Sequence, residues 1–216
     1  MPNTLMESQL KNYIRESSTA LGLFKTGPVL KNLMDSLLKG VNLYLVGMMG
    51  AGKTTVGREL ATRLGYRFID TDAVIEQLTG QSISQLFASF GEAEFRQLES
   101  QVLAEICAYK NLAIATGGGI VMRRENWSYL HHGLIVWLDV PVEQLYARLQ
   151  TDTTRPLLQD PDPLGKLRSL LEQRQPLYAQ ADLRVTVSGE ETLEQLATRV
   201  LEEIPTVLKK GTGSSN

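Results

Sequence analysis

The sequence predicts an α/β fold in which helices cover both faces of a parallel β-sheet. Along most of the chain, short apolar segments that suit buried strands alternate with longer segments that have the apolar periodicity of helices. The chain has 216 residues, of which 43% are hydrophobic, so one domain with a sizeable core is expected. One predicted strand runs into a glycine-rich loop and then into a helix, as the nucleotide-binding members of this fold class require.

Composition and charge exclude several classes of protein. The formal net charge of −2 gives no general attraction to nucleic acid or to an anionic membrane, and neither is expected as a partner. No apolar run approaches the length of a membrane span. The only cysteine, Cys107, excludes an intrachain disulfide and is expected to be a small buried hydrophobic residue within a helix. The only histidines, His131 and His132, stand together in a predicted turn, so a zinc site is not expected.

Residues 1–39 come before the first predicted strand and are interpreted as an N-terminal appendage of unknown role. They lack the apolar core of a secretory signal, and their acidic residues argue against an organellar transit peptide. We therefore expect a cytoplasmic location, with the plastid stroma as the alternative. Residues 30–40 have the pattern of a short amphipathic helix that ends at Gly40. Removal of residues 1–36 is expected to leave the function intact.

The first predicted strand, residues 41–46, leads into a loop with the spacing Gly-x-x-x-x-Gly-Lys-Thr, which matches the nucleotide-binding loop. The glycines that would let this backbone approach phosphate oxygens are Gly47, Gly50 and Gly52. The N–H groups that open the helix predicted over residues 55–64 would then bind phosphate. Lys53 could reach the β- and γ-phosphates, and the Thr54 hydroxyl could bind Mg²⁺. A coincidental glycine-rich turn is the alternative, but the position between a strand and a helix favours nucleotide binding.

Two aspartates follow the second predicted strand, residues 66–69, at alternate positions. Asp70 and Asp72 lie at the carboxyl end of this strand, where ligands gather in open α/β sheets. Asp72 could instead cap the helix predicted over residues 72–80, because aspartate is a preferred N-cap residue. This structural role explains one aspartate but not both.

Two helices are expected next, over residues 83–90 and 92–109, with Ser82 as the N-cap of the first. Within the longer helix, Arg96 and Glu99 are three residues apart and could pair on the helix surface. Taken alone, Arg96 is interpreted as a solvated charge.

The third predicted strand, residues 112–115, is followed by Thr116 and then by three consecutive glycines. Glycines are costly in backbone entropy, so a specific requirement must explain Gly117, Gly118 and Gly119. Either a tight turn needs them or a ligand lies against bare backbone. Their position at the end of a strand favours the ligand.

After a helix expected over residues 125–130, a fourth predicted strand, residues 134–139, ends in Asp139. An apolar strand that ends in aspartate resembles a second metal-binding motif of nucleotide-binding proteins. Asp139 also lies just before Pro141, which suits the first position of a helix, so a role at the helix start is at least as good an interpretation. Asp70 and Asp139 therefore remain alternatives for the magnesium role.

Residues 151–163, after a helix expected over residues 141–150, are rich in Thr, Asp and Pro, a composition typical of a mobile loop. Arg155, in the middle of this segment, would have a use if the loop closed over phosphates. The expected elements after the loop are a helix over residues 164–178 with Pro176 near its end, a strand over residues 183–187, a helix over residues 190–208 and a disordered tail over residues 209–216.

From the residues alone, the best-supported activity is phosphoryl transfer from a nucleotide to a small anionic hydroxylated metabolite. Phosphoryl transfer depends mostly on positioning and electrostatic stabilisation. The chain can supply a phosphate cradle, a metal site, a carboxylate facing the acceptor hydroxyl and an arginine over the transferring group. Because arginine can hold a carboxylate bidentately, a cluster of arginines indicates an anionic acceptor. The members of this cluster are Arg96, Arg155 and Arg174.

Six segments occur in the order and spacing of the shikimate kinases, and the chain resembles this family from about Gly40 to Glu203. The segments are GMMGAGKTTVGRELA, FIDTD, FGEAEFRQLE, TGGGIV, RPLL and EQRQPLY. The resemblance implies a P-loop kinase fold like that of the nucleoside monophosphate kinases, with a five-stranded parallel sheet in the order 2-3-1-4-5. It also implies a kinase domain over residues 40–208, with a closing lid at about residues 151–163.

The reaction implied by this resemblance is transfer of the γ-phosphoryl group of ATP to the 3-hydroxyl of shikimate, with Mg²⁺, in the biosynthesis of chorismate and aromatic amino acids. Asp72 would bind the reacting hydroxyl and accept its proton, while Thr54 and Asp70, rather than Asp139, would serve the metal. The implied shikimate contacts are Asp72, Arg96, Gly117, Gly118, Gly119 and Arg174. The implied nucleotide contacts are Gly47, Gly50, Ala51, Gly52, Lys53, Thr54, Thr55, Arg148 against adenine and Arg155 over the transferring phosphoryl group. The implied catalytic residues are Asp72, Lys53 and Arg155.

Two other functions remain as alternatives. The first is a kinase of another small hydroxylated acid such as gluconate, against which the pair Arg96 and Arg174 and the triple glycine argue. The second is a kinase-like module that binds nucleotide without catalysis. The intact residues that argue against it are Lys53, Thr54, Asp70, Asp72 and Arg155. The expected partners are the small molecules ATP and shikimate, and the protein is expected to be a monomer.

Overall fold

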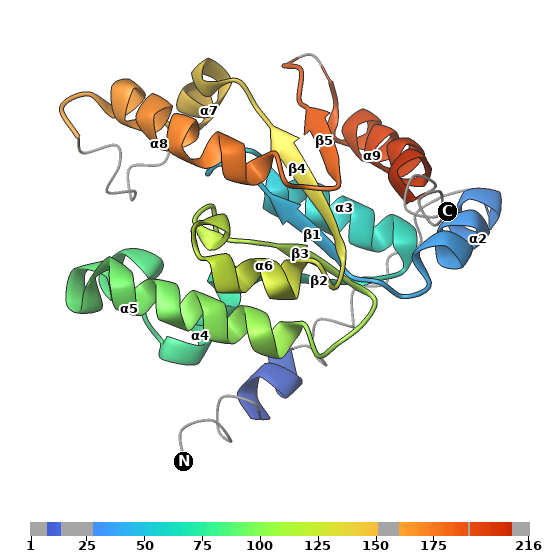
Figure 1. The fold of residues 1–216 in the computed structure, drawn as a ribbon, viewed down its shortest axis with the longest axis horizontal. Coiled ribbons are helices and arrows are strands. Elements are labelled where there is room, and N and C mark those ends of the chain that lie inside the picture. Colours follow the sequence, from blue (N-terminus) through green and yellow to red (C-terminus); the bar gives the residue numbers. More distant parts are fainter. Residues whose placement is uncertain (1–7, 14–27, 151–159, 190, 209–216) are drawn as a thin grey trace, which may run out of the picture.

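The computed structural model describes residues 8–13, 28–150, 160–189 and 191–208 (Figure 1). At its centre is a five-stranded parallel sheet in the order β2-β3-β1-β4-β5, which confirms the predicted fold class and strand order. The strands are β1 (Leu43–Val46), β2 (Arg67–Asp70), β3 (Leu112–Ala115), β4 (Leu134–Asp139) and β5 (Leu183–Thr186). Because all five are parallel, their carboxyl ends meet at one edge of the sheet.

Burial along the strands follows their place in the sheet. Every residue of β1 and β3 is buried, as expected for central parallel strands that are covered on both faces. The edge strand β5 alternates buried and exposed residues. Tyr44 on β1 and Trp137 on β4 are among the largest fully buried side chains, so the core is built directly on the sheet.

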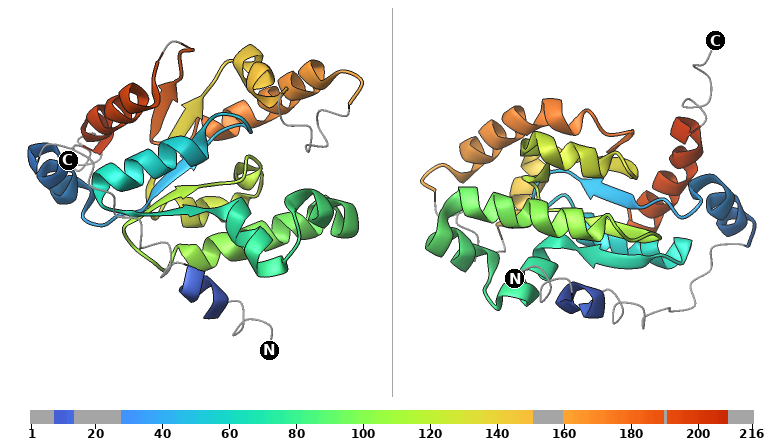
Figure 2. Two further views of the ribbon diagram at one scale, coloured as in Figure 1. Left: turned by 180° about the vertical axis from the view of Figure 1, so that it is seen from behind. Right: turned by 60° about the horizontal axis from the view of Figure 1, so that its bottom comes forward.

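Helices cover both faces of the sheet, with α3 on the face seen in the left panel of Figure 2 and α6 on the face turned to the viewer in Figure 1. Helix α9 packs beside α3, and α7 packs beside α8. The helices are a short one over residues 8–13, α2 (Pro28–Leu38), α3 (Lys53–Leu64), α4 (Thr71–Thr79), α5 (Ile83–Ile106), the 3₁₀ turn η2 (Ile120–Met122), α6 (Arg124–Leu130), α7 (Val142–Leu149), α8 (Pro163–Tyr178) and α9 (Leu193–Leu208).

Helix α5 contains the two predicted helices, which follow each other directly across a kink at Gly91. Ser82 caps the first of them as predicted, in a capping box with Gln85, and the second ends at Ile106 rather than at Tyr109. Gly91 interrupts the regular geometry with φ 82° and ψ 176°, a conformation that side chains with a Cβ rarely adopt. The glycine therefore separates the two helices at the kink, where the prediction placed the boundary between them.

The N-terminal segment contributes to the core, which its interpretation as an appendage did not foresee. Helix α2 contacts α3 and α9, and its side chains Met34 and Leu38 are buried in the main hydrophobic cluster. Leu10, in the short helix over residues 8–13, is only 1% exposed. This helix lies against α4 and far from α2 (Figures 1 and 2). Packing therefore extends across the predicted boundary at residue 40.

The remaining predicted features concern membrane spans, Cys107 and the segments that the structure does not describe. Among the described helices, none has the length and apolar character needed to cross a membrane. Cys107 is the C-cap of α5 and half-buried, with its Sγ 3.0 Å from the Tyr44 hydroxyl, rather than a residue inside the helix. The predicted tail, residues 209–216, lies outside the described residues, as do residues 151–159 of the predicted lid.

Candidate active site

A cavity of about 630 Å³ opens at the carboxyl edge of the sheet and gathers nearly all of the predicted site residues. Those that line it are Gly50, Ala51, Gly52, Lys53, Thr54, Thr55, Asp70, Asp72, Arg96, Gly117, Gly118, Gly119, Arg148 and Arg174. Gly47 lies at the base of the same loop, where its carbonyl accepts a hydrogen bond from Lys53. Arg155 lies outside the described residues. Residues from β1, β2, β3 and their following helices therefore converge on one space.

The loop between β1 and α3 has the conformation that its glycines predict. Gly47 has φ 140°, and a Cβ there would lie 2.7 Å from the Leu138 carbonyl oxygen. Gly52, with φ 89°, is the N-cap of α3, and within the described residues no side chain caps this helix. The N–H groups at the start of α3 therefore form an open site for an anion.

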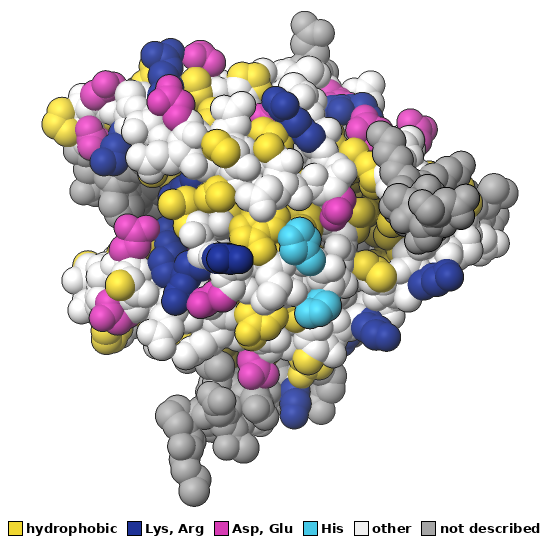
Figure 3. Space-filling model, in the orientation of Figure 1, with side chains coloured by type: hydrophobic (Ala, Val, Ile, Leu, Met, Phe, Trp, Pro, Cys, Tyr) yellow, Lys and Arg dark blue, Asp and Glu magenta, His cyan; other side chains and the backbone are white. Residues whose placement is uncertain are grey.

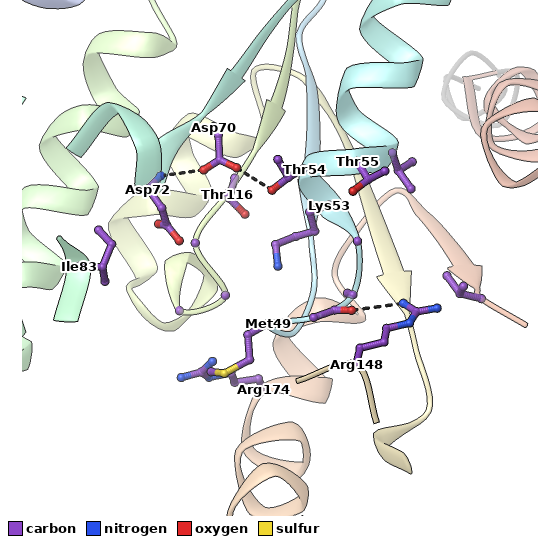
Figure 4. A pocket seen from close by; sticks show the side chains of 18 of the residues that line it. Met49, Lys53, Thr54, Thr55, Asp70, Asp72, Ile83, Thr116, Arg148 and Arg174 are labelled. Carbon is purple, nitrogen blue, oxygen red and sulfur yellow. Dashed lines mark hydrogen bonds between the residues drawn. The ribbon is translucent and has the colours of Figure 1, made fainter. Parts of the chain in front are cut away.

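Lys53 lies within this loop and is almost fully buried. Its Nζ donates hydrogen bonds of 2.9 Å and 2.8 Å to the carbonyls of Gly47 and Met48. Figure 4 shows the ammonium group pointing from the start of α3 into the cavity. A positive charge is thus held beside the helix N-terminus, in the position that a phosphate chain would need.

Asp70 joins the starts of two helices. Its Oδ2 accepts a 2.7 Å hydrogen bond from the Thr54 hydroxyl, and its Oδ1 accepts from the backbone N–H groups of Asp72 and Ala73 (Figure 4). Asp70 is therefore the N-cap of α4, and the interpretation of Asp72 as the cap is wrong. Asp72 stands in the first turn, and its side chain extends toward the cavity.

Asp139 has neither of the two predicted roles. Its Oδ2 accepts hydrogen bonds of 3.0 Å and 2.7 Å from Arg184 on the neighbouring strand β5. Helix α7 begins after Pro141 without a side-chain cap, and Asp139 does not line the cavity. The cause is the strand register, which pairs Trp137 with Arg184 and so brings the arginine within reach of Asp139.

A basic wall faces the phosphate loop across the cavity. Arg96, from α5, donates a 2.6 Å hydrogen bond to Glu99 and a 3.1 Å bond to Glu92. Its guanidinium carbon also lies 5.3 Å and 5.6 Å from the ring centroids of Phe95 and Phe87. Arg96 is therefore a fixed charge at the cavity rather than a solvated one, and Figure 3 shows basic side chains gathered in this hollow.

Glu99 is buried, which contradicts the prediction of a surface pair with Arg96. Its side chain is 1% exposed. Burial raises the pKa of this carboxyl group, and the positive charges of Arg96 and then Arg174 oppose that rise. Within the described residues, Glu99 Oε1 is buried and has no hydrogen-bond partner. Glu99 is thus a buried carboxyl group that contacts Arg96 and interacts electrostatically with Arg174.

Arg174 completes the basic wall from α8. The residue is 6% exposed, and its Nε is buried without a hydrogen-bond partner among the described residues. A guanidinium group that is held out of water without full hydrogen bonding is suited to an anionic ligand. Arg148 lies elsewhere on the cavity wall, where it donates a 3.2 Å hydrogen bond to the Gly50 carbonyl (Figure 4).

The three glycines form a tight turn that is also packed against side chains. A Cβ on Gly117 would overlap Glu99 and lie 2.8 Å from Asp72 Oδ1, and a Cβ on Gly119 would overlap the Arg96 guanidinium group. The turn is closed by the Ile120 N–H, which donates to the Gly117 carbonyl at 3.2 Å. The tight turn is therefore confirmed, and the same backbone faces the cavity, where a ligand could lie against it.

Some residues that build the site were not singled out by the sequence analysis. The buried Thr71 accepts a 3.0 Å hydrogen bond from the Gly117 N–H, which ties the glycine turn to α4. The Tyr178 hydroxyl donates to the Gly118 carbonyl at 2.5 Å. Another part of the wall comes from the segment after β5, whose lining residues are Val187, Glu191, Thr192, Leu193 and Leu196. Only the helix-start pattern of Thr192 could have drawn attention to that segment.

Comparison with known proteins agrees with this geometry. A family model described as shikimate kinase matches residues 49–205. A shikimate kinase from Nostoc sp. is 71% identical over 177 residues, which cover 82% of this chain and 98% of that protein. The solved structure of a shikimate kinase from Acinetobacter baumannii in complex with shikimate has a TM-score of 0.75 at 42% identity, and the match covers 82% of this chain and 97% of that one.

A more distant likeness concerns the fold alone. A gluconokinase from Sinorhizobium meliloti has a TM-score of 0.50 at 15% identity, covering 82% of this chain and 98% of that one. By contrast, the shikimate kinase model spans most of the chain, and the relative from Nostoc sp. matches it over nearly its own full length. The chain therefore belongs to the shikimate kinase family.

Proposed function

We propose that this protein transfers the γ-phosphoryl group of ATP to the 3-hydroxyl of shikimate and so produces ADP and shikimate 3-phosphate. The observation that carries this proposal is one cavity in which a phosphate loop, two aspartates and three arginines meet. Such a cavity can hold a triphosphate and a carboxylated ring alcohol side by side. The family supports shikimate as the acceptor, and the solved relative from Acinetobacter baumannii contains shikimate.

The nucleotide would lie on the β1–α3 loop. The start of α3 and the Lys53 ammonium group would bind the β- and γ-phosphates, with Thr55 beside them. Arg148, on the same wall as this loop, would lie against the adenine. Arg155 would cover the transferring phosphoryl group, a role that rests on the sequence because Arg155 lies outside the described residues.

The pair Thr54 and Asp70 has the donor chemistry that suits Mg²⁺. Its hydroxyl and carboxylate oxygens, 2.7 Å apart, are hard ligands. Among the described residues, no three side chains of Asp, Glu, His or Cys gather into a metal cage. This agrees with Mg²⁺ in kinases, which takes most of its ligands from phosphates and water. When bound, the ion would neutralise negative charge on the phosphate oxygens.

The acceptor would lie between Asp72, the glycine turn and the basic wall. Arg96 and Arg174 would hold the shikimate carboxylate, and this would direct the ring hydroxyls toward Asp72 and the glycine backbone. The 3-hydroxyl oxygen would then form a bond to the γ-phosphorus as the bond from that phosphorus to the β–γ bridging oxygen breaks. ADP would leave with that electron pair, and the hydroxyl proton would pass to Asp72.

A coupled assay of ADP release tests the proposal, with shikimate, gluconate and no acceptor as parallel arms. We expect release that depends on shikimate, and a new phosphate monoester of shikimate in the ³¹P NMR spectrum of the products. Release with gluconate but not with shikimate would overturn the choice of acceptor. ATP binding without release in any arm would instead indicate a non-catalytic module. The predicted monomer and cytoplasmic location rest on the sequence, and gel filtration would test the first of these.

A further inference from the structure

The peptide groups of the glycine turn are held by their carbonyls. The Gly117 carbonyl accepts a hydrogen bond from the Ile120 N–H at 3.2 Å, and the Gly118 carbonyl accepts one from the Tyr178 hydroxyl at 2.5 Å. The Gly117 N–H is also used, because it donates to Thr71 Oγ1 at 3.0 Å. Two N–H groups are left, those of Gly118 and Gly119, and within the described part of the chain neither donates a hydrogen bond to protein.

The direction of these two N–H groups follows from the planarity of the peptide bond. No peptide bond of the described residues is cis, and in a trans peptide the N–H points opposite to the preceding C=O. The Gly119 N–H therefore points away from the Tyr178 hydroxyl. Gly118 and Gly119 line the cavity, whereas Tyr178 does not. The tyrosine thus lies on the protein side of this peptide, and the N–H lies on the cavity side.

Tyr178, which binds the Gly118 carbonyl, is itself held firmly in place. It is fully buried at the end of α8, one helical turn after Arg174, and its ring stacks on Trp137 with the centroids 5.8 Å apart. Its hydroxyl also lies 3.7 Å from Met48 Sδ, in the phosphate loop. Burial raises the pKa of Tyr178 to about 12, against the opposing charge of Arg174, so the hydroxyl remains a donor at neutral pH.

We propose that Tyr178 is a positioning residue for the acceptor: by holding the Gly118 carbonyl, it aims the Gly119 N–H at a ring hydroxyl of the bound hydroxy acid. This inference rests on the proposed function, since it needs an acceptor between the glycine turn and the basic wall. It concerns acceptor binding and not the nucleotide, because Gly119 is packed against Arg96 and not against Lys53. Without the tyrosine hydroxyl, the peptide could rotate and the N–H would lose its direction.

The test compares Tyr178→Phe with Tyr44→Phe. Both changes remove one hydroxyl from a fully buried tyrosine, but the Tyr44 hydroxyl is bonded to Cys107, which does not line the cavity. We expect both variants to lose a similar amount of thermal stability. Only Tyr178→Phe should raise the KM for shikimate, by about 5- to 10-fold, because one oriented hydrogen bond to the acceptor is weakened. The KM for ATP should stay within about twofold of the wild type in both variants.

Each other outcome of this comparison has a defined meaning. An unchanged KM for shikimate in folded Tyr178→Phe overturns the inference, and so does an equal rise in the KM values for shikimate and ATP. If Tyr178→Phe is too slow to assay, calorimetric titration with shikimate decides, with weaker binding expected than for Tyr44→Phe. Wild-type protein without shikimate-dependent ADP release would mean that the proposed function has failed, which is a separate result.

Discussion

Glu99, at 1% side-chain exposure, accepts a hydrogen bond of 2.6 Å from Arg96 at the wall of the cavity. A second carboxylate, Glu92, contacts the same guanidinium group at 3.1 Å but is 68% exposed. Buried ion pairs are worth far more than exposed ones in fixing geometry, since water does not compete for the donors. The buried partner is therefore the one expected to hold Arg96 in place.

Replacement of Glu99 should weaken acceptor binding. In Glu99→Gln the guanidinium group loses its charged anchor, and we expect the KM for shikimate to rise about tenfold while the KM for ATP changes little. Glu92→Gln serves as the matched control, because it removes the exposed partner of the same arginine and should change either KM by less than about twofold. Equal effects of the two substitutions would show that burial of Glu99 has no functional importance.

Stability should depend on pH through Glu99. Burial raises the pKa of this carboxyl group above its ordinary value of 4.5, so the folded protein takes up a proton that the unfolded chain has lost in this window. The unfolding free energy of the wild type should therefore fall relative to Glu99→Gln as the pH rises from 4.5. The difference should change by at most about 1.4 kcal/mol per pH unit. Urea titrations of both proteins between pH 4 and pH 7 would measure it. A wild-type unfolding free energy that rises relative to that of Glu99→Gln with increasing pH would contradict the direction of the shift.

Asp72→Asn should abolish turnover and leave ATP binding intact. The amide keeps the shape of the side chain and its position in the first turn of α4, but it cannot accept the proton of the attacking hydroxyl. We expect kcat to fall by at least about 100-fold. Glu76→Gln, on the same helix, is the control, because Glu76 accepts a hydrogen bond from the Ile83 N–H and does not line the cavity. Near-normal turnover of Asp72→Asn would remove Asp72 from the proton-accepting role.

Arg199→Ala should raise the KM for ATP. Arg199 binds Glu191 through two hydrogen bonds of 2.9 Å and 2.7 Å and also donates to the Thr186 carbonyl. It therefore ties the end of β5 to Glu191 in the cavity wall that follows this strand. We expect a rise of about 3- to 10-fold, with no change in the KM for shikimate. Arg168→Ala is the control: it breaks an exposed ion pair with Glu143 and should change neither the KM for ATP nor the KM for shikimate. A rise in both KM values would indicate general loosening instead.

Met34→Ala should destabilise the fold, although Met34 lies before residues 49–205, the part of the chain that the shikimate kinase family model matches. The side chain is buried in the core, and loss of a buried methionine side chain typically costs about 2–5 kcal/mol. Leu33→Ala, next to it on α2, changes a side chain that is 46% exposed and should cost less than about 0.5 kcal/mol. Denaturant titration would measure both values. Equal, small losses would restore the interpretation of residues 1–39 as a detached appendage.

Local sequence was sufficient for the features that depend on local chemistry. The apolar runs fixed the strands, and the capping preference of serine placed the start of α5 at Ser82. The loop from Gly47 to Thr54 could be predicted because the backbone angles that it needs are open to few residues other than glycine. The family resemblance favoured Asp70 over Asp139 for the magnesium role, and of the two it is Asp70 that lines the cavity, beside Thr54.

Features that depend on contacts distant in the chain could not be predicted in this way. Asp139 is bound by Arg184 because of the register between β4 and β5, which no single strand encodes. The burial of Glu99 depends on the glycine turn that packs over it, and the role of Tyr178 depends on how α8 meets that turn. A charged pair three residues apart gives no sign of which face of the helix it occupies until the neighbouring elements are placed.

The position of Asp70 has a practical consequence for mutagenesis. One of its oxygens is bound to the nucleotide side of the cavity through Thr54, and the other holds the first turn of the helix that carries Asp72. A variant at Asp70 would thus disturb both Thr54 and the helix that carries Asp72, so its kinetics could not separate an effect on the nucleotide from an effect on the acceptor. Thr54→Val, which leaves the α4 cap in place, is the cleaner way to test the proposed role of Thr54 in Mg²⁺ binding on its own.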